Sequence, residues 1–223
     1  MRSLVINSGG ESKRLKEFTD LSLGKAWLKV QGKPLLIQNI ESLQGSVEEI
    51  SIIVRNINQA YRFEAELDRY SHLIETEKVH VVTERQENIP PGPIRGIISG
   101  IQSSRKDIVW FMPCDHPFLT PEIFEKLESH LMEQSMVTLQ HDAIGFEPQI
   151  FVSDLKTLKY FSTFVNELPV DLFRLVPNSL FLPVTDKKDL LALLGVNTPT
   201  QLETLLNHAL KKENTIKTGG NKL

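Results

Sequence analysis

The chain has 223 residues, of which 40% are hydrophobic and 24% charged, with a net charge of −3 and a pI of about 6.1. This balance is ordinary for one soluble domain and provides no basic field for a nucleic-acid backbone. The single cysteine, Cys114, excludes an internal disulfide and a cysteine-rich metal site. No apolar run approaches the length of a membrane span, and the N-terminus has no signal-peptide core, so we expect a cytoplasmic protein without a membrane partner.

Apolar runs that alternate with helix-period segments extend along most of the chain. The predicted strands are Leu4–Ile6, Ile50–Val54, Val79–Val82, Ile108–Met112, Met136–Leu139, Gln149–Val152 and Asn178–Val184. The predicted helices are Leu35–Leu43, Ala60–Tyr70, Ile94–Ser103, Pro121–Met132, Leu155–Leu168 and Thr200–Lys211. Such alternation indicates an α/β fold, a three-layer, Rossmann-like, mostly parallel sheet with helices on both faces. We expect a single domain over residues 1–211, with a short apolar segment at Val170–Leu175 and a frayed tail at 212–223.

The first predicted strand runs into a glycine pair and then into cations. Ser8, Gly9 and Gly10 are followed by Arg14 and Lys25. Glycine lets phosphate oxygens approach free backbone N–H groups, and cations neutralise those oxygens. The segment is neither a Walker loop nor a dinucleotide fingerprint, and a plain glycine turn with solvated charges is an equally good interpretation of it alone.

Three later segments carry further signals. Gly92, Pro93 and Gly96 stand between a strand pattern and a helix pattern. Asp115 follows the apolar run Ile108–Met112, and Asn197 precedes the last helix. Because ligands of parallel sheets bind beyond the carboxyl ends of the strands, we expect the glycine pair and Asp115 to meet at one edge. A carboxylate facing phosphates suits Mg²⁺, whereas a strand-end aspartate that caps a turn is the simpler alternative.

Taken in order, the four segments NSGGESKR, GPIRGI, PCDHPF and VNTPTQL resemble those of the molybdenum cofactor guanylyltransferase family, of the nucleotide-diphospho-sugar transferase fold type. The resemblance extends from about Leu4 to Leu210. It implies a Mg²⁺-dependent nucleotidyltransferase that transfers GMP from GTP to Mo-molybdopterin, with molybdoenzyme assembly proteins as further partners. No side-chain base is needed, since the attacking phosphate is already an anion.

The resemblance also implies roles for individual residues. Asp115 is expected to be the metal ligand, Lys25 to contact the α-phosphate and Arg14 to hold the leaving pyrophosphate. The glycine pair with Ser8 cradles the phosphates, and the segment from Gly92 through Pro93 to Gly96 wraps the base. Asn197 is expected to face the acceptor.

The chain departs from the family pattern in two places. Arg14 and Lys25 stand eleven positions apart, where the pattern has five, so Glu17–Leu23 is an insertion that can form a lid. Gly195 replaces the first asparagine of the family's NxNTP segment, which removes a polar contact. Two alternatives therefore stay open: a cytidylyltransferase or a sugar-phosphate or cobinamide nucleotidyltransferase, and a non-catalytic adaptor that binds the nucleotide and hands over the cofactor.

Overall fold

The computed structural model describes residues 1–10, 13–15, 17–18, 23–85, 89, 92–141, 145–161, 173, 176–204 and 206. The strands are β1 (Arg2–Asn7), β2 (Lys29–Val30), β3 (Lys33–Pro34), β4 (Glu49–Val54), β5 (Val79–Thr83), β6 (Ile108–Pro113), β7 (Met136–His141), β8 (Gly145–Asp154) and β9 (Ser179–Pro183). The α-helices are α1 (Leu35–Leu43), α2 (Ile57–Asp68), α3 (Pro93–Ser103), α4 (Pro121–Glu128), α5 (Leu155–Phe161) and α7 (Lys187–Ala192). Short 3₁₀ turns lie at Lys13–Leu15, Lys25–Trp27, Gln44–Ser46 and Thr76–Lys78.

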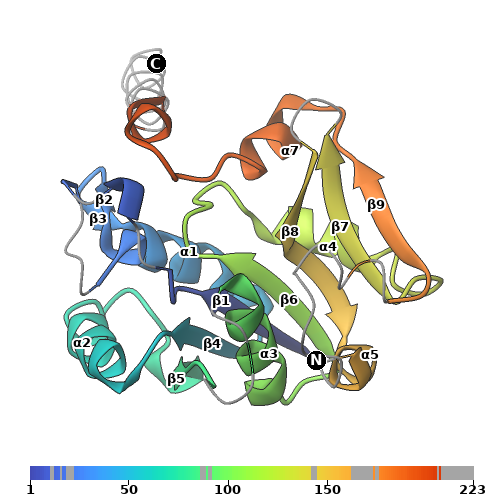
Figure 1. The fold of residues 1–223 in the computed structure, drawn as a ribbon, viewed down its shortest axis with the longest axis horizontal. Coiled ribbons are helices and arrows are strands. Elements are labelled where there is room, and N and C mark those ends of the chain that lie inside the picture. The colour runs from blue at the N-terminus through green and yellow to red at the C-terminus, as the bar shows by residue number, and fades with distance from the viewer. Residues whose placement is uncertain are drawn as a thin grey trace, which may run out of the picture.

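Seven strands form one sheet in the order β5-β4-β1-β6-β8-β7-β9 (Figure 1). Strands β5, β4, β1 and β6 pair in parallel, and β7 pairs in parallel with β9. Strand β8 is antiparallel to both of its neighbours, β6 and β7. The predicted mostly parallel α/β sheet is confirmed. The strand order reverses at β1, which has β4 on one side and β6 on the other, and open parallel sheets bind their ligands at such a point.

Helices cover both faces of the sheet, because successive strand side chains point to opposite sides. Leu4 and Ile6 of β1 belong to an apolar cluster with α1, α2 and α4. Val5, between them in sequence, packs in a second cluster with α3 and α5. The three layers therefore follow from the two-residue period of the buried strands (Figure 1).

Several predicted boundaries change in the structure. Helix α4 ends at Glu128, four residues before the predicted Met132, and the hairpin β2–β3 was not predicted. Its turn places Gln31 and Gly32 at positive φ (53° and 77°), which fits the glycine seen there. The predicted helix Leu155–Leu168 is confirmed as far as Phe161, and its remainder lies outside the described residues.

The other predictions near the C-terminus are also confirmed only in part. Residues 199–204 are helical, as predicted for the start of this helix, and the hydroxyl of Thr198 accepts from the backbone N–H of Gln201 at 3.3 Å, as an N-cap does. Most of the segment Val170–Leu175 and the whole tail 212–223 lie outside the described residues.

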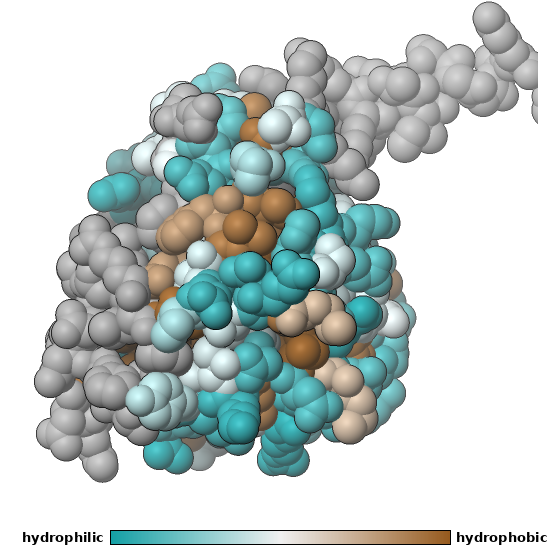
Figure 2. Space-filling view, turned by 90° about the vertical axis from the view of Figure 1, so that its right-hand side faces the viewer, coloured by the Kyte–Doolittle hydropathy of each residue, from teal (hydrophilic) through white to brown (hydrophobic). Residues whose placement is uncertain are grey.

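Strand β9 forms the outer edge of the sheet and leaves apolar side chains partly exposed. Leu180, Phe181 and Leu182 are each only half-buried. Viewed from this side, the molecule shows brown apolar surface among hydrophilic residues (Figure 2). Among the described residues, no helix combines the length and apolarity needed to cross a bilayer.

Candidate active site

A cavity of about 600 Å³ opens at the carboxyl edge of the parallel strands. Each of these four strands is followed within three residues by residues of the cavity wall: Gly9 and Gly10 after β1, Arg55 after β4, Glu84 after β5, and Cys114 and Asp115 after β6. The glycine pair and Asp115, a hundred positions apart in sequence, therefore meet as predicted. The full lining is Asn7, Ser8, Gly9, Gly10, Lys25, Arg55, Glu84, Gly92, Pro93, Arg95, Pro113, Cys114, Asp115, His116, Gln149 and Asn197.

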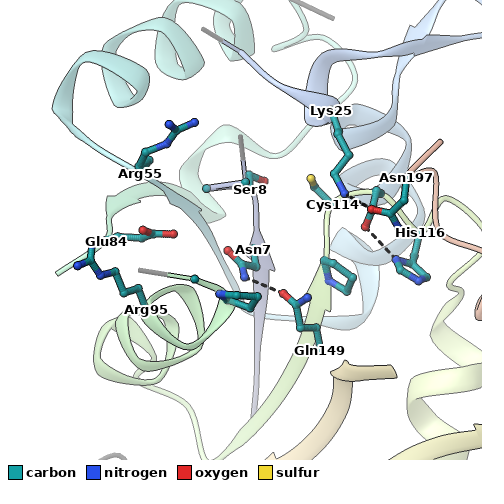
Figure 3. A pocket seen from close by; sticks show the side chains of 16 residues that line it. Asn7, Ser8, Lys25, Arg55, Glu84, Arg95, Cys114, His116, Gln149 and Asn197 are labelled. Atoms are coloured by element: carbon teal, nitrogen blue, oxygen red, sulfur yellow. Dashed lines mark hydrogen bonds and ion pairs between the residues drawn. The ribbon is translucent and has the colours of Figure 1, made fainter. Parts of the chain in front are cut away.

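The two ends of the cavity carry different chemistry (Figure 3). One end is built around Lys25 and Asp115, which we call the phosphate end. The other is built around Glu84, with Arg55 and Arg95 on either side, which we call the base end. Both names refer to the nucleotide that we propose as ligand below.

At the phosphate end, the Asp115 carboxylate is the centre of a network. Lys25 donates from Nζ to Asp115 Oδ2 and, at 2.7 Å, to Asn197 Oδ1. His116 Nδ1 lies 3.0 Å from Asp115 Oδ1. Burial raises the pKa of Asp115, but His116 and Lys25 more than offset this, so the pKa lies well below its ordinary value. The carboxylate is therefore ionised although its side chain is only 3% exposed.

Backbone hydrogen bonds hold this aspartate in place. The carbonyl of Asp115 accepts from the N–H of Val196 at 2.9 Å, which ties the 195–197 loop to the end of β6. Buried Asn39 of α1 donates to the carbonyl of Cys114 at 3.0 Å. Burial raises the pKa of the Cys114 thiol to about 12, so Cys114 is a small core residue and not a nucleophile.

At the base end, Glu84 lies between two cations (Figure 3). Burial raises the pKa of Glu84, and the charges of Arg95 and Arg55 oppose that rise. Arg95 donates from Nε to the carbonyl of Ile89 at 2.7 Å, which fixes its side chain beside the cavity. A Cβ on Gly9 would lie 2.1 Å from Glu84 Oε1, so glycine lets this carboxylate reach over the loop.

The middle of the cavity is polar. Asn7 donates from Nδ2 to Gln149 Oε1 at 2.9 Å and so joins the end of β1 to β8 (Figure 3). Gly92, with φ of 142°, and Pro93 bring the first turn of α3 to the rim. Pro93 has no N–H, and the backbone N–H of Arg95 donates to the carbonyl of Gly92 at 3.2 Å, so this turn shapes the rim more than it supplies donors.

Two predicted site residues do not line the cavity. Gly96 is buried inside α3, where a Cβ would lie 2.3 Å from Asn7 Oδ1, so this glycine permits close packing of α3 on β1. Arg14 is exposed on the short turn Lys13–Leu15 and is absent from the lining. The insertion that contains the predicted lid, Glu17–Leu23, lies partly outside the described residues.

Sequence reasoning missed Asn7, Arg55, Glu84 and Gln149 as lining residues. One signal was available: Arg55 and Glu84 are the first residues after the observed strands β4 and β5, at strand ends like the one that Asp115 follows. Gln149 had no such signal, because it lies within antiparallel β8.

A Rossmann-like sheet whose carboxyl edge joins glycine loops, a lysine and a buried aspartate defines a nucleotide-binding α/β protein of the nucleotide-diphospho-sugar transferase type. The family model of the MobA-like NTP transferase domain matches residues 4–162, and the chain belongs to this family of nucleotidyltransferases.

Relatives with this fold include molybdenum cofactor guanylyltransferases. The one from Aliivibrio fischeri (strain MJ11) is 25% identical over 203 residues, 90% of this chain and 93% of its own length. The one from Histophilus somni (strain 2336) is 33% identical over 127 residues, and the match spans 57% of this chain but only 55% of that relative. The crystal structure of molybdopterin-guanine dinucleotide biosynthesis protein A from Archaeoglobus fulgidus superimposes with a TM-score of 0.70 at 16% identity, over 94% of this chain and 99% of that one.

Proposed function

We propose that this chain transfers GMP from GTP to Mo-molybdopterin and releases pyrophosphate. The observation that supports it best is the meeting of Gly9, Gly10, Lys25, Gly92 and Asp115 in one cavity of a MobA-like NTP transferase fold. The guanylyltransferase names of the relatives supply the donor and the acceptor.

The phosphate end fits a metal–triphosphate complex in its donor set. Mg²⁺ in nucleotide sites takes one or two carboxylates together with phosphate oxygens and water, and Asp115 is an ionised carboxylate on the cavity wall. Among the described residues no group of three or more potential ligands surrounds it, which agrees with a site completed by the substrate's own oxygens. The Lys25 ammonium donates to Asp115 Oδ2 and Asn197 Oδ1 in this structure. These two oxygens therefore already stabilise one positive charge at this end of the cavity. When bound, Mg²⁺ would neutralise charge on the triphosphate.

The reaction needs positioning and charge neutralisation more than proton transfer. The acceptor phosphate attacks the α-phosphorus of GTP, and pyrophosphate leaves with the electron pair of the broken P–O bond. Lys25, released from Asp115 by the incoming ligand, would stabilise charge on the α-phosphate. The N–H groups of Gly9 and Gly10 would hold phosphate oxygens, and Asn197 would orient the acceptor beside Asp115.

The base end offers hydrogen-bond acceptors that match the donors of guanine. Guanine presents N1–H and the N2 amino group side by side, and a carboxylate offers two acceptors in matching geometry. Glu84 is the carboxylate at this end. Cytosine presents one amino donor next to an unprotonated ring nitrogen, which would face Glu84 with a repulsive lone pair. The glycine segment at Gly92 remains our proposed backbone wall of the base site.

A pyrophosphate-release assay tests this function. GTP, CTP, ATP and UTP are each incubated with the protein and Mg²⁺, with and without Mo-molybdopterin. We expect pyrophosphate only with GTP and acceptor together. Incorporation of cytidine would indicate the cytidylyltransferase alternative, and tight GTP binding without turnover would indicate the adaptor.

A further inference from the structure

The imidazole of His116 is buried at the phosphate end, where it contacts Asp115 and lies against Gly195. Its side chain is 3% exposed, as is that of Asp115, and Nδ1 lies 3.0 Å from Asp115 Oδ1. An ionised carboxylate oxygen only accepts, so Nδ1 carries the proton and donates. Lys25 donates to the other oxygen, Oδ2. His116 thus holds the side of Asp115 that faces away from Lys25.

The ring of His116 also fills space that only a glycine leaves open. A Cβ built on Gly195 would lie 2.7 Å from Cε1 and 3.0 Å from Nε2 of His116. Gly195 is not among the residues with positive φ, so its backbone conformation does not demand glycine. The same Cβ would lie 3.1 Å from Nδ2 of Asn197, so the space taken by the His116 ring, and less tightly by Asn197, is what favours glycine here.

These contacts connect two features that the sequence shows separately. The family pattern has asparagine where this chain has Gly195, which by itself removes a polar side chain from the site. An asparagine at that position would collide with the His116 ring as placed here. The histidine at 116 and the glycine at 195 therefore amount to an exchange of space, in which the ring occupies the room that a side chain at 195 would need.

We propose that His116 is the positioning residue of Asp115, and that Gly195 provides the space in which its ring lies. Fixing Oδ1 also fixes Oδ2, because a carboxylate rotates as a rigid plane. Oδ2 then stays directed at Lys25 and the cavity. The proposal rests on the proposed function only for what Asp115 does to the substrate.

Two substitutions separate a hydrogen-bonding role from simple packing. His116→Asn keeps an N–H donor at the δ position, although it leaves part of the ring space empty. His116→Leu keeps apolar bulk and removes the donor. A positioning role predicts that the asparagine variant is the better enzyme, and a packing role predicts the reverse order.

The experiment measures kcat, the KM for GTP, the thermal midpoint, and GTP affinity by calorimetry with and without Mg²⁺. We expect His116→Leu to lower kcat about 10- to 100-fold. The gain in GTP affinity on adding Mg²⁺ should fall by a similar factor. His116→Asn should retain most of both. Leucine better than asparagine, or both equal to the native protein, would overturn the proposal. If even the native protein does not turn over, the proposed function fails, while the order of the binding measurements still tests His116.

Gly195→Ala tests the exchange itself and does not depend on whether His116→Leu folds. In the native background it should push the ring and reduce kcat. In the His116→Asn background, which lacks Cε1 and Nε2, its effect should be much smaller. Additive effects of the two substitutions would show that positions 116 and 195 are independent.

Discussion

The two ends of the cavity differ in how completely their charges are compensated. At the phosphate end, Asp115 is almost fully buried, and each of its oxygens has a partner. At the base end, Glu84 is less buried, and its pKa is raised where that of Asp115 is lowered. Under the proposed function, the prearranged network would serve the transfer step, whereas the base end would take its hydrogen-bond partners from the ligand.

Removing the charge of Asp115 should have the largest effect. Asp115→Asn keeps the size of the side chain but loses the negative charge that would hold the metal, so kcat should fall about 100- to 1,000-fold or more. Circular dichroism and the thermal midpoint serve as controls for the fold. Normal turnover with Mg²⁺ would refute the metal assignment, and an unfolded variant would favour a purely structural aspartate.

Lys25 and Arg14 provide the next test, because only one of them lies in the cavity. Lys25→Met should lower kcat about 100-fold with a smaller change in KM, as expected for a contact made in the transition state. Arg14→Ala should raise only the KM for GTP, and by less, because Arg14 is exposed outside the lining. Steady-state kinetics of both variants test this difference. Unchanged kinetics in Lys25→Met would show that Lys25, which follows the insertion, is not the lysine of the family pattern.

Glu84 should control the choice of base. Glu84→Gln replaces one acceptor by a donor that faces the donors of guanine, at an expected cost of about 1.5–3 kcal/mol, roughly 10- to 100-fold in GTP affinity. Competition between GTP and CTP measures the loss of preference. Glu64→Gln, on the exposed face of α2, is the matched control and should leave the preference unchanged. An unaltered preference in Glu84→Gln would place base reading elsewhere.

The raised pKa of Glu84 predicts a pH dependence of binding. As the pH falls through that pKa, the carboxyl is protonated and one acceptor is lost, so GTP affinity should start to fall at a higher pH than for an ordinary glutamate. The same sign means that ionised Glu84 costs folding stability at neutral pH, since the fold favours the protonated form. Glu84→Gln should therefore flatten this part of the binding profile without destabilising the protein at pH 7. Calorimetric titrations from pH 7 downwards supply the comparison.

The smallest effect concerns packing beside the cavity. Gly96→Ala would place a Cβ within 2.6 Å of three atoms of the Asn7 side chain, so Asn7 must move and its bond to Gln149 is strained. We expect a loss of about 1–3 kcal/mol in unfolding free energy. Gly10→Ala, with nothing within 4 Å of its Cβ, is the control and should change stability by less than about 0.5 kcal/mol. Equal stabilities in chemical denaturation would contradict the packing role of Gly96.

The sequence by itself determined the α/β class, most of the main strands and the edge at which the site forms. It did so because buried parallel strands are continuous apolar runs, and because residues directly after them share one edge. By this rule Gly9, Gly10 and Asp115 could be placed together before any coordinates. The same rule, applied to β4 and β5, would have found Arg55 and Glu84.

Only the tertiary structure decided how these residues pair. Arg14 and Lys25 are both cations of the opening segment, yet Lys25 lies in the cavity and contacts Asp115, whereas Arg14 is exposed outside the lining. In the sequence Gly195 reads only as a missing polar contact, whereas in the structure the ring of His116 occupies the space that this glycine leaves. Gln149 arrives from an antiparallel strand whose register depends on pairing with β6 and β7. The local pattern fixes which edge of the sheet such residues share, whereas the pairing of individual side chains from distant segments depends on the packing of the whole sheet.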